Sequence, residues 1–331
     1  MKRLPTALLV AVATTLAVAA AIAVPAHATT PGHNGSIVFS ANVGNGLQLW
    51  TVRENGHDLR QITHADGDAS GADWSPDGRT IVFEFDPSDG SGAFIERVNA
   101  DGTGAVNLTP QTPCCSGQPA FSADGRRIFF ERFDPLTFVD GIWSMNADGS
   151  DQRPVIAPFP QSGFATDPNV SPDGRTLSFV AWDGSLAGPT GEPAQALFTS
   201  SVDGADARQL TPFSIDLAIK HDWAPDGRHI VVTTNANFFH AGDSANIATI
   251  RPDGSGLHFL TSYTGGDVNA FVGSYSPDGN WIVFRLENHG SYALYRMKAD
   301  GTNLHAILPF SSFRPRFIDW GPRADDDGGS R

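Results

Sequence analysis

Short apolar runs alternate with tight polar turns along most of the chain. One recurring unit is an aromatic or aliphatic residue, a turn of the Ser-Pro-Asp-Gly kind and a short apolar run, as from Trp74 to Phe83. Proline fixes φ at the first turn position, aspartate caps the turn, and glycine takes the left-handed conformation. The unit therefore predicts a β-hairpin. Later copies follow at spacings of 47, 49, 53 and 52 residues and occupy segments 121–130, 170–179, 223–232 and 275–284.

A second unit, an apolar strand followed by a turn of the Ala-Asp-Gly kind, alternates with the first. Seven residues before the glycine of each turn stands an aliphatic residue, and these are Leu49, Ile95, Ile142, Leu197, Ile247 and Leu294. A position that is aliphatic in every copy predicts a buried strand residue. Each repeat of about 50 residues then contains four antiparallel strands, which is typical of a propeller blade.

The two ends of the chain each hold part of one repeat. Residues 317–322 copy the first strand and the start of its turn, while residues 37–39, 47–52 and 59–63 supply the other three strands. Pairing the C-terminal strand with the N-terminal blade would close a ring and remove two sheet edges. The sequence therefore predicts an all-β fold, a six-bladed β-propeller with four-stranded blades over residues 36–322. An open solenoid is the alternative.

Residues 1–28 have the pattern of a secretory signal peptide. Lys2 and Arg3 precede a long apolar run, and Ala26-His27-Ala28 offers a small-x-small cleavage site. An uncleaved membrane anchor is the alternative. We interpret residues 29–35 as a lead-in and residues 323–331 as a disordered acidic tail. The expected location is secreted or extracytoplasmic, in the periplasm or cell envelope, with no stable membrane anchor after cleavage.

These Pro-Asp-Gly blades resemble the TolB-type propeller repeat family over essentially the whole chain after Ala28. The resemblance implies the propeller fold, but such propellers carry many different functions. TolB proteins have an α/β domain before the propeller, and related peptidases add a hydrolase domain. The segment between Ala28 and Ile37 is too short for the first, and no residues follow Arg331 to form the second. We therefore expect neither a Tol–Pal role nor a peptidase.

The net charge and the absence of known catalytic motifs narrow the range of possible functions. The 331 residues include 22 lysines and arginines against 36 acids, a net charge of −14. Nucleic-acid binding is not expected, because phosphate recognition needs a positive surface. The sequence also lacks a His-Glu-x-x-His zinc motif, a Gly-x-Ser-x-Gly nucleophile turn and a phosphate loop. A monomeric, non-catalytic binding protein is the leading hypothesis.

Both kinds of turn should lie on one face of the propeller, the turn face. The variable links should lie on the other, the loop face, where function usually resides. They are residues 66–73, 84–92, 131–140, 182–195, 213–221, 234–244, 263–272 and 287–291. We predict that this face binds a protein or a cell-envelope polymer. The predicted contact residues are His221, Trp182, Phe238, Phe239, Phe271 and Arg132.

Four histidines fall on the predicted loop face, namely His64, His221, His240 and His289. Converging imidazoles bind transition metals. The family resemblance also includes lyases of oligouronides that use a histidine-bound metal on a propeller face. A metal-dependent polysaccharide lyase is therefore the alternative hypothesis, and separately solvated histidines are the simpler interpretation.

Two further loop features suggest bound calcium and a disulfide. Asp66 and Asp68 resemble the opening of a calcium loop, where oxygens at alternate positions meet a hard cation. A polar link between blades is the alternative. Cys114 and Cys115 are adjacent, and we predict a vicinal disulfide, since export favours oxidation although neighbouring Cα atoms lie closer than disulfides prefer. Free thiols or an intermolecular bridge are the alternatives.

Overall fold

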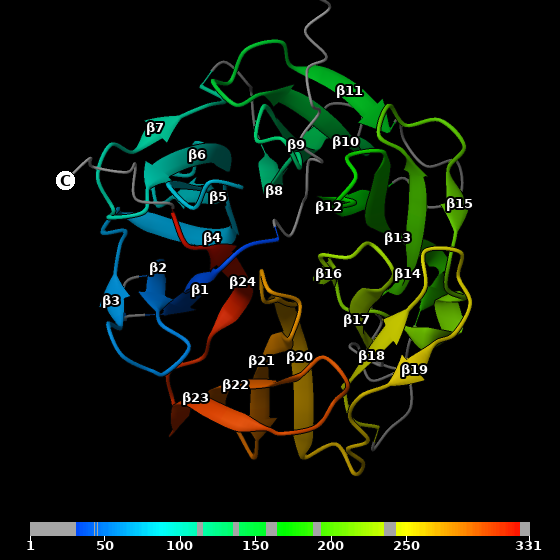
Figure 1. Ribbon diagram of the computed structural model, residues 1–331. Coiled ribbons are helices and arrows are strands. Elements are labelled where there is room, and N and C mark those ends of the chain that lie inside the picture. The colour runs from blue at the N-terminus through cyan, green and yellow to red at the C-terminus, as the bar shows by residue number, and fades with distance from the viewer. Residues whose placement is uncertain are drawn as a thin grey trace, which may run out of the picture.

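The structure is a computed structural model that describes residues 31–42, 44, 46–110, 115–134, 139–156, 164–187, 193–234 and 243–324. Six antiparallel sheets of four strands lie side by side in a ring (Figure 1). In each blade the first strand of the repeat lies nearest the central axis, and the fourth lies at the rim (Figure 1). The predicted six-bladed β-propeller is confirmed.

Blades are numbered from the one that contains the first strand of the chain. Blade 1 contains β24 (Arg316–Pro322), β1 (Asn34–Asn42), β2 (Leu47–Val52) and β3 (Arg60–Gln61). Blade 2 contains β4 (Gly67–Trp74), β5 (Thr80–Pro87), β6 (Phe94–Asn99) and β7 (Val106–Asn107). Blade 3 contains β8 (Ser116–Phe121), β9 (Arg127–Asp134), β10 (Val139–Asn146) and β11 (Arg153–Ile156).

The second half of the ring repeats this arrangement. Blade 4 contains β12 (Ala165–Val170), β13 (Thr176–Ala187), β14 (Pro193–Ser201) and β15 (Arg208–Gln209). Blade 5 contains β16 (His221–Trp223), β17 (Ile230–Thr234), β18 (Asn246–Ile250) and β19 (His258–Phe259). Blade 6 contains β20 (Val268–Tyr275), β21 (Trp281–Asn288), β22 (Ser291–Lys298) and β23 (His305–Ser311).

The chain closes its own ring in blade 1. Strand β24 pairs antiparallel with β1, with Ile37 opposite Trp320 and Val38 opposite Asp319. Figure 1 shows the blue first strand beside the red last strand. The predicted pairing is confirmed, and it removes the two sheet edges that an open ring would expose.

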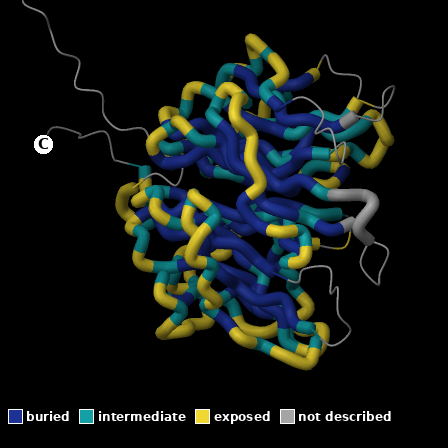
Figure 2. The backbone as a smooth tube through the Cα atoms, turned by 90° about the vertical axis from the view of Figure 1, so that its right-hand side faces the viewer, coloured by how far each residue is buried: buried dark blue, intermediate teal, exposed yellow. Residues whose placement is uncertain are grey.

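The apolar core lies between neighbouring blades. All six aliphatic residues that precede the Ala-Asp-Gly-type turns are 0% exposed, as the repeat pattern predicts. One cluster brings Leu49 of blade 1 against Ile81 and Val98 of blade 2, and the other blade junctions have similar clusters. Figure 2 shows these buried strands enclosed by exposed turns.

Side-chain hydrogen bonds also join the innermost strands from blade to blade. Three carboxylates each accept a hydrogen bond from a backbone N–H of the following blade: Asp319 from Trp74 at 3.0 Å, Asp73 from Phe121 at 2.8 Å, and Asp222 from Tyr275 at 2.8 Å. Ser274 Oγ accepts in the same way from Trp320 at 2.7 Å. In these four blades the polar residue before the aromatic position therefore holds neighbouring blades in register.

The Ser-Pro-Asp-Gly turns are closed by their own side chains. In blade 2 the Ser75 hydroxyl donates to Asp77 Oδ1 at 2.6 Å, and the Arg79 N–H donates to the same oxygen at 3.0 Å. The turn glycine must be small and left-handed. Gly78, for example, has a φ of +67°, and an added Cβ would clash with the backbone carbonyl of Pro322 in blade 1.

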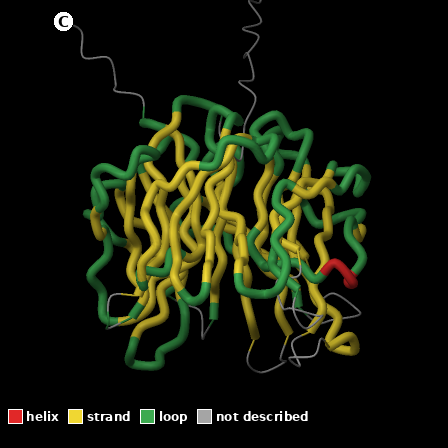
Figure 3. Tube along the Cα trace, turned by 90° about the horizontal axis from the view of Figure 1, so that it is seen from below, coloured by secondary structure: helices red, strands yellow, loops and turns green. Residues whose placement is uncertain are grey.

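The strands run between two loop-bearing faces (Figure 3). The Ser-Pro-Asp-Gly and Ala-Asp-Gly-type turns form the turn face, because each joins strands at the same end of its blade. The links between second and third strands and between blades form the loop face. It includes the 3-10 helix η1 (Phe213–Ile215). Within the described ranges, no helix has the length and apolar character needed to cross a membrane.

Candidate functional site

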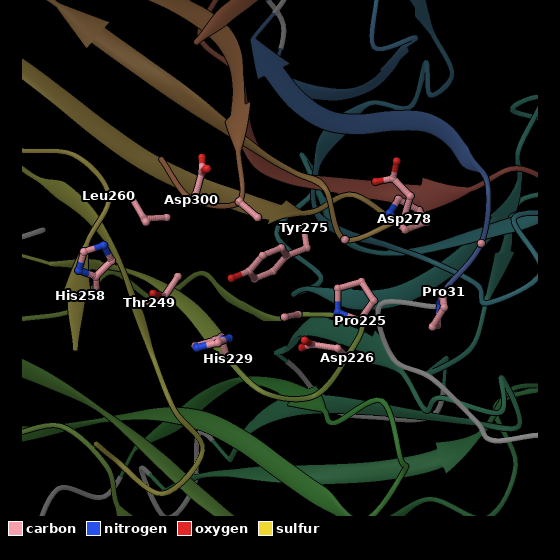
Figure 4. Close-up of a pocket in the computed structure, with 15 residues that line it drawn as sticks. Pro31, Pro225, Asp226, His229, Thr249, His258, Leu260, Tyr275, Asp278 and Asp300 are labelled. Carbon is pink, nitrogen blue, oxygen red and sulfur yellow. The ribbon is translucent and has the colours of Figure 1, made fainter. Parts of the chain in front are cut away.

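A hollow of about 760 Å³ opens on the turn face between blades 5 and 6. Figure 4 shows the Tyr275 ring among Pro225, Asp226 and His229 on one side and Asp300 on the other. Burial, with smaller effects from Asp222 and Asp226, raises the pKa of Tyr275 above its ordinary value.

This turn-face hollow is one copy of a repeated feature. Hollows of about 470 Å³ and 450 Å³ lie between blades 4 and 5 and between blades 2 and 3. Each copy is bounded by a turn proline and the aromatic residue of the following inner strand: Pro225 with Tyr275, Pro172 with Trp223, and Pro76 with Phe121. Such grooves follow from the blade repeat and do not identify a specific site.

A different cavity, of about 500 Å³, opens on the loop face near the central axis. Its charged and aromatic lining comes from four separate parts of the chain and is not repeated around the ring. We call it the basic cavity and define it by Lys220, Phe271, Arg285, Arg314 and Arg316. No aspartate or glutamate is among its described lining residues. Its volume falls within the usual range of ligand sites, about 300–1,000 Å³.

Arg285 forms one wall of the basic cavity and is held on several sides. Its side chain leaves β21 directly opposite Phe271 of β20, and its Cζ lies 4.2 Å from the centre of the Phe271 ring. Its Nη1 donates to the Pro315 carbonyl at 3.2 Å. The residue is 8% exposed, and its buried Nε has no hydrogen-bond partner in the described part of the chain.

Arg314 stands in the link that leads into β24, and Arg316 is the first residue of that strand. Arg314 and Arg285 share one carboxylate: their Nη2 atoms lie 3.5 Å and 3.6 Å from Glu287 Oε2. Arg316 makes no ion pair with any described residue. Burial, together with the charge of Arg314, lowers the pKa of Arg285 to about 10 and also lowers that of Arg316. Arg285 therefore keeps its positive charge at neutral pH.

Lys220 forms the floor of the basic cavity, between the arginines and the carboxylates of the inner strands. Burial lowers its pKa, but four surrounding carboxylates raise it by more, so the net shift is upward; they belong to Asp167, Asp319, Asp73 and Asp222. Lys220 therefore stays charged and compensates the acids below it. Burial and the nearby Asp319 raise the pKa of Asp73 well above its ordinary value.

His221 belongs to a buried polar network in the channel wall. Its Nδ1 lies 3.0 Å from Asp167 Oδ2, and its Nε2 lies 2.7 Å from Ser178 Oγ. The Trp223 indole also donates to Ser178 Oγ at 2.8 Å. His221 and Ser178 are both 0% exposed. The predicted loop-face contact through His221 is therefore wrong, because its ring is sealed inside the blades.

Acids occupy the opposite side of the ring from the basic cavity. Glu84 in β5 and Glu131 in β9 stand at the repeat position that Arg285 holds in β21. Burial, then the neighbouring Glu131, raises the pKa of Glu84 to about 7. Burial raises the pKa of Asp140 to about 6. Burial and the adjacent Asp140 raise the pKa of Glu131, which also accepts a hydrogen bond from Thr166.

Among the predicted contact residues that the structure describes, only Phe271 lines the basic cavity. Trp182 is half-buried and stacks on Phe164, with ring centres 4.6 Å apart. Arg132 lies over Trp143, with its Cζ 4.5 Å from the ring centre, and donates to Gln152 Oε1 at 2.7 Å. Burial lowers its pKa to about 10. Phe238 and Phe239 lie outside the described residues.

The structure does not bring the predicted metal ligands together. His64 and His289 are exposed, His221 is buried as described above, and His240 lies outside the described residues. Within the described ranges, no three His, Cys, Asp or Glu side chains are placed to hold a metal ion.

Asp66, Asp68 and Cys115 do not line the basic cavity. Asp66 and Asp68 are exposed, and Asp68 Oδ1 accepts a hydrogen bond from the Leu47 N–H at 2.6 Å. Cys115 is disulfide-bonded. Cys114 lies outside the described residues, so the vicinal pairing stays a prediction.

No known protein-family model matches the chain. It is 29% identical over 200 residues to "Uncharacterized peptidase YuxL" of Bacillus subtilis, which covers 50% of this chain and 28% of that protein. It is 30% identical over 129 residues to "Uncharacterized protein Atu1656" of Agrobacterium fabrum, covering 37% and 43%. It is 49% identical over 39 residues to "Tol-Pal system protein TolB" of Nitratidesulfovibrio vulgaris, covering 12% and 9%. The chain thus spans less than half the length of each of these relatives.

Among solved structures, TolB from Acinetobacter baumannii aligns with a TM-score of 0.68 at 17% identity, over 87% of this chain and 67% of that one. The protein has the TolB-type propeller fold. A chain of a nidogen/laminin complex aligns with a TM-score of 0.63 at 15% identity, over 87% and 98%. Puromycin hydrolase aligns with a TM-score of 0.56 at 19% identity, over 85% and 48%. The shared fold therefore occurs in proteins of quite different kinds.

In this TolB-type propeller the most distinctive loop-face residues are ones that the sequence analysis missed. A usable signal was present at Arg285, which stands where the equivalent strands of blades 2 and 3 carry glutamate. Arg314 and Arg316 gave a second signal, because they flank a proline just before the closing strand. A charge reversal at one repeat position could have pointed to this side of the ring.

Proposed function

We propose that this protein is an exported, non-catalytic propeller that binds a protein partner through its loop face, with the basic cavity at the centre of the contact. The observation that carries the proposal is the lining of that cavity by four cationic side chains that are not part of the repeat. Buried carboxylates already compensate Lys220, but among the described residues the three arginines pair only with Glu287. Positive charge buried in excess of its carboxylates is unfavourable, so a partner that supplies anions would stabilise this cavity.

The solved relatives support a protein partner over a cell-envelope polymer. One of them is a chain of a nidogen/laminin complex, and this protein aligns with 98% of that chain. TolB likewise carries the name of a multi-protein system. A polymer partner remains the second candidate on the same face.

Enzymatic activity is the competing proposal, and it comes from the relatives named peptidase and hydrolase. Those matches cover 28% and 48% of the relatives' own chains. Within this chain the Ser178–His221–Asp167 network is sealed from solvent, which favours a binding role. The lyase alternative would need a transition metal, so elemental analysis of the purified protein tests it: a stoichiometric metal supports it, and none counts against it.

Site-specific photo-crosslinking tests the binding proposal in cells that produce the protein. A photoreactive amino acid is placed at Asp86 or Ser312, which are exposed on the loop face, or at Asp101 or Asp253, which are exposed on the turn face. The same protein should be captured from both loop-face positions and from neither turn-face position. Equal capture from the two faces, or no capture, would contradict the proposal.

A further inference from the structure

We infer that the basic cavity binds an acidic segment of a protein partner and seats a side-chain or terminal carboxylate against Arg285, Arg314 and Arg316. This inference rests on the proposed function and names the chemistry that the loop face recognises. It begins from the charge balance inside the cavity. Arg285 and Arg314 share the single carboxylate of Glu287 at 3.6 Å and 3.5 Å, and Arg316 pairs with no acid among the described residues.

The geometry of Arg285 suits a planar, bidentate anion. Its guanidinium is fixed by the Phe271 ring and the Pro315 carbonyl, so little side-chain freedom is left to lose on binding. Arginine pairs with carboxylate through two parallel N–H···O bonds, which are stronger than neutral hydrogen bonds. The Nε of Arg285 is buried and has no hydrogen-bond partner among the described residues, so a donor of this guanidinium is still unsatisfied.

The rest of the lining fits a peptide. Phe271, Val272 and Ile318 provide apolar walls for the methylene groups of an acidic side chain. Gln195 offers a buried Oε1 with no hydrogen-bond partner in the described part of the chain, and a peptide N–H would satisfy it. A uronate polymer shares the carboxylates but presents hydroxyl-covered rings to these apolar walls, so a peptide is the better match.

The negative charge of the surrounding surface directs an acidic segment to the basic cavity. The whole chain carries 36 acids against 22 lysines and arginines. Most of its surface therefore repels an acidic segment, and the basic cavity gathers four cations at one place. Because the inner-strand carboxylates already compensate the charge of Lys220, the attraction for an acidic segment comes from the three arginines.

The direct test measures binding of a labelled hexaglutamate peptide to the full chain by fluorescence anisotropy, with hexaglutamine as the uncharged probe. Hexaglutamate should bind and hexaglutamine should not. The variant Arg314→Gln/Arg316→Gln should weaken binding at least about tenfold, since it removes two charge-assisted contacts. The matched control is Arg126→Gln/Arg228→Gln, which removes two exposed arginines from the turn face and should change affinity less than about twofold.

A variant that should raise the affinity for hexaglutamate distinguishes a change in recognition from damage to the fold. Glu287→Gln removes the internal competitor for Arg285 and Arg314, so hexaglutamate should bind several-fold more tightly. A variant that merely loosened the blade would bind more weakly.

Three outcomes would overturn the inference: equal affinities for the loop-face and control variants, weaker binding by Glu287→Gln, or binding of an oligogalacturonate but not of hexaglutamate. If loop-face cross-linking to a protein persists in any of these cases, the proposed function stands and only the acidic-segment inference fails.

Discussion

The Nε2 atom of His221 lies 2.7 Å from the Oγ atom of Ser178, and neither side chain reaches solvent. With Asp167 Oδ2 at 3.0 Å from the other ring nitrogen, the order of groups matches that of an acyl-transfer triad. The Trp223 indole donates to the same hydroxyl, and Ser178 donates to the Asn169 carbonyl. This serine therefore joins two blades and is not available as a nucleophile.

The first prediction concerns this buried network. Ser178→Ala should lower the free energy of unfolding by about 1–3 kcal/mol, because the buried groups of His221 and Trp223 lose a partner. Urea denaturation measures the change, with Ser312→Ala, which alters an exposed residue, as the control. The native protein should also resist a fluorophosphonate probe. Labelling that Ser178→Ala abolishes would show that this account is wrong.

The second prediction concerns the closing strand. Trp320 is 2% exposed and packs among residues of blades 1 and 6. Trp320→Ala should lower the free energy of unfolding by about 3–5 kcal/mol. Trp182→Ala is the matched control and should cost less, because Trp182 is only half-buried. Equal losses for the two tryptophans would mean that ring closure contributes no special stability.

The third prediction concerns pH. The raised pKa values of Glu84, about 7, and Asp140, about 6, mean that the folded chain holds these protons more tightly than the unfolded chain. The contribution of these two groups to the free energy of unfolding is therefore fully present below about pH 4 and is lost as the pH rises to about 7. Glu84→Gln should flatten that loss and raise the free energy of unfolding at pH 8 by about 2 kcal/mol.

Urea titrations across this pH range measure the slope for the native protein and for Glu84→Gln. Asp66→Asn changes an exposed acid and should leave the slope as it is. A slope that survives unchanged in Glu84→Gln would assign the pH dependence to other groups.

The fourth prediction concerns export. Cleavage after Ala28 should give a mature protein that begins at Thr29, because Ala26 and Ala28 form the small-x-small site. N-terminal sequencing of protein from the cell envelope or medium checks this. Replacing Ala28 by a bulky residue should leave the precursor uncut, and the corresponding change at Thr30 should not. Recovery of the intact precursor from wild-type cells would contradict the prediction.

The fold could be predicted because its signals repeat. Leu49 and its five equivalents are all buried, so a wrong assignment in one repeat would have been corrected by the other five. The closing strand was recognisable because residues 317–322 copy a pattern already present in the other blades. Hydrophobic periodicity and turn chemistry are local properties, and local properties can be read from one sequence.

The candidate site could not be predicted in the same way, because it depends on differences among the repeats. Arg285 and Arg314 are separated in sequence and meet only in the folded chain, at the shared carboxylate of Glu287. His221 was predicted as a loop-face contact, but its exposure depends on whether Ser178 and Asp167 cover it. Phe271 was the one contact prediction that the cavity includes.

Ring closure in blade 1 also decides how the protein can be tethered. The N–H of Gly32 donates to the Pro277 carbonyl, and the N–H of Arg323 donates to the His33 carbonyl, so both ends of the described chain leave from the turn face. A linker, a resin or a membrane attached through either terminus would therefore leave the loop face directed toward the solvent, with the basic cavity accessible to a partner.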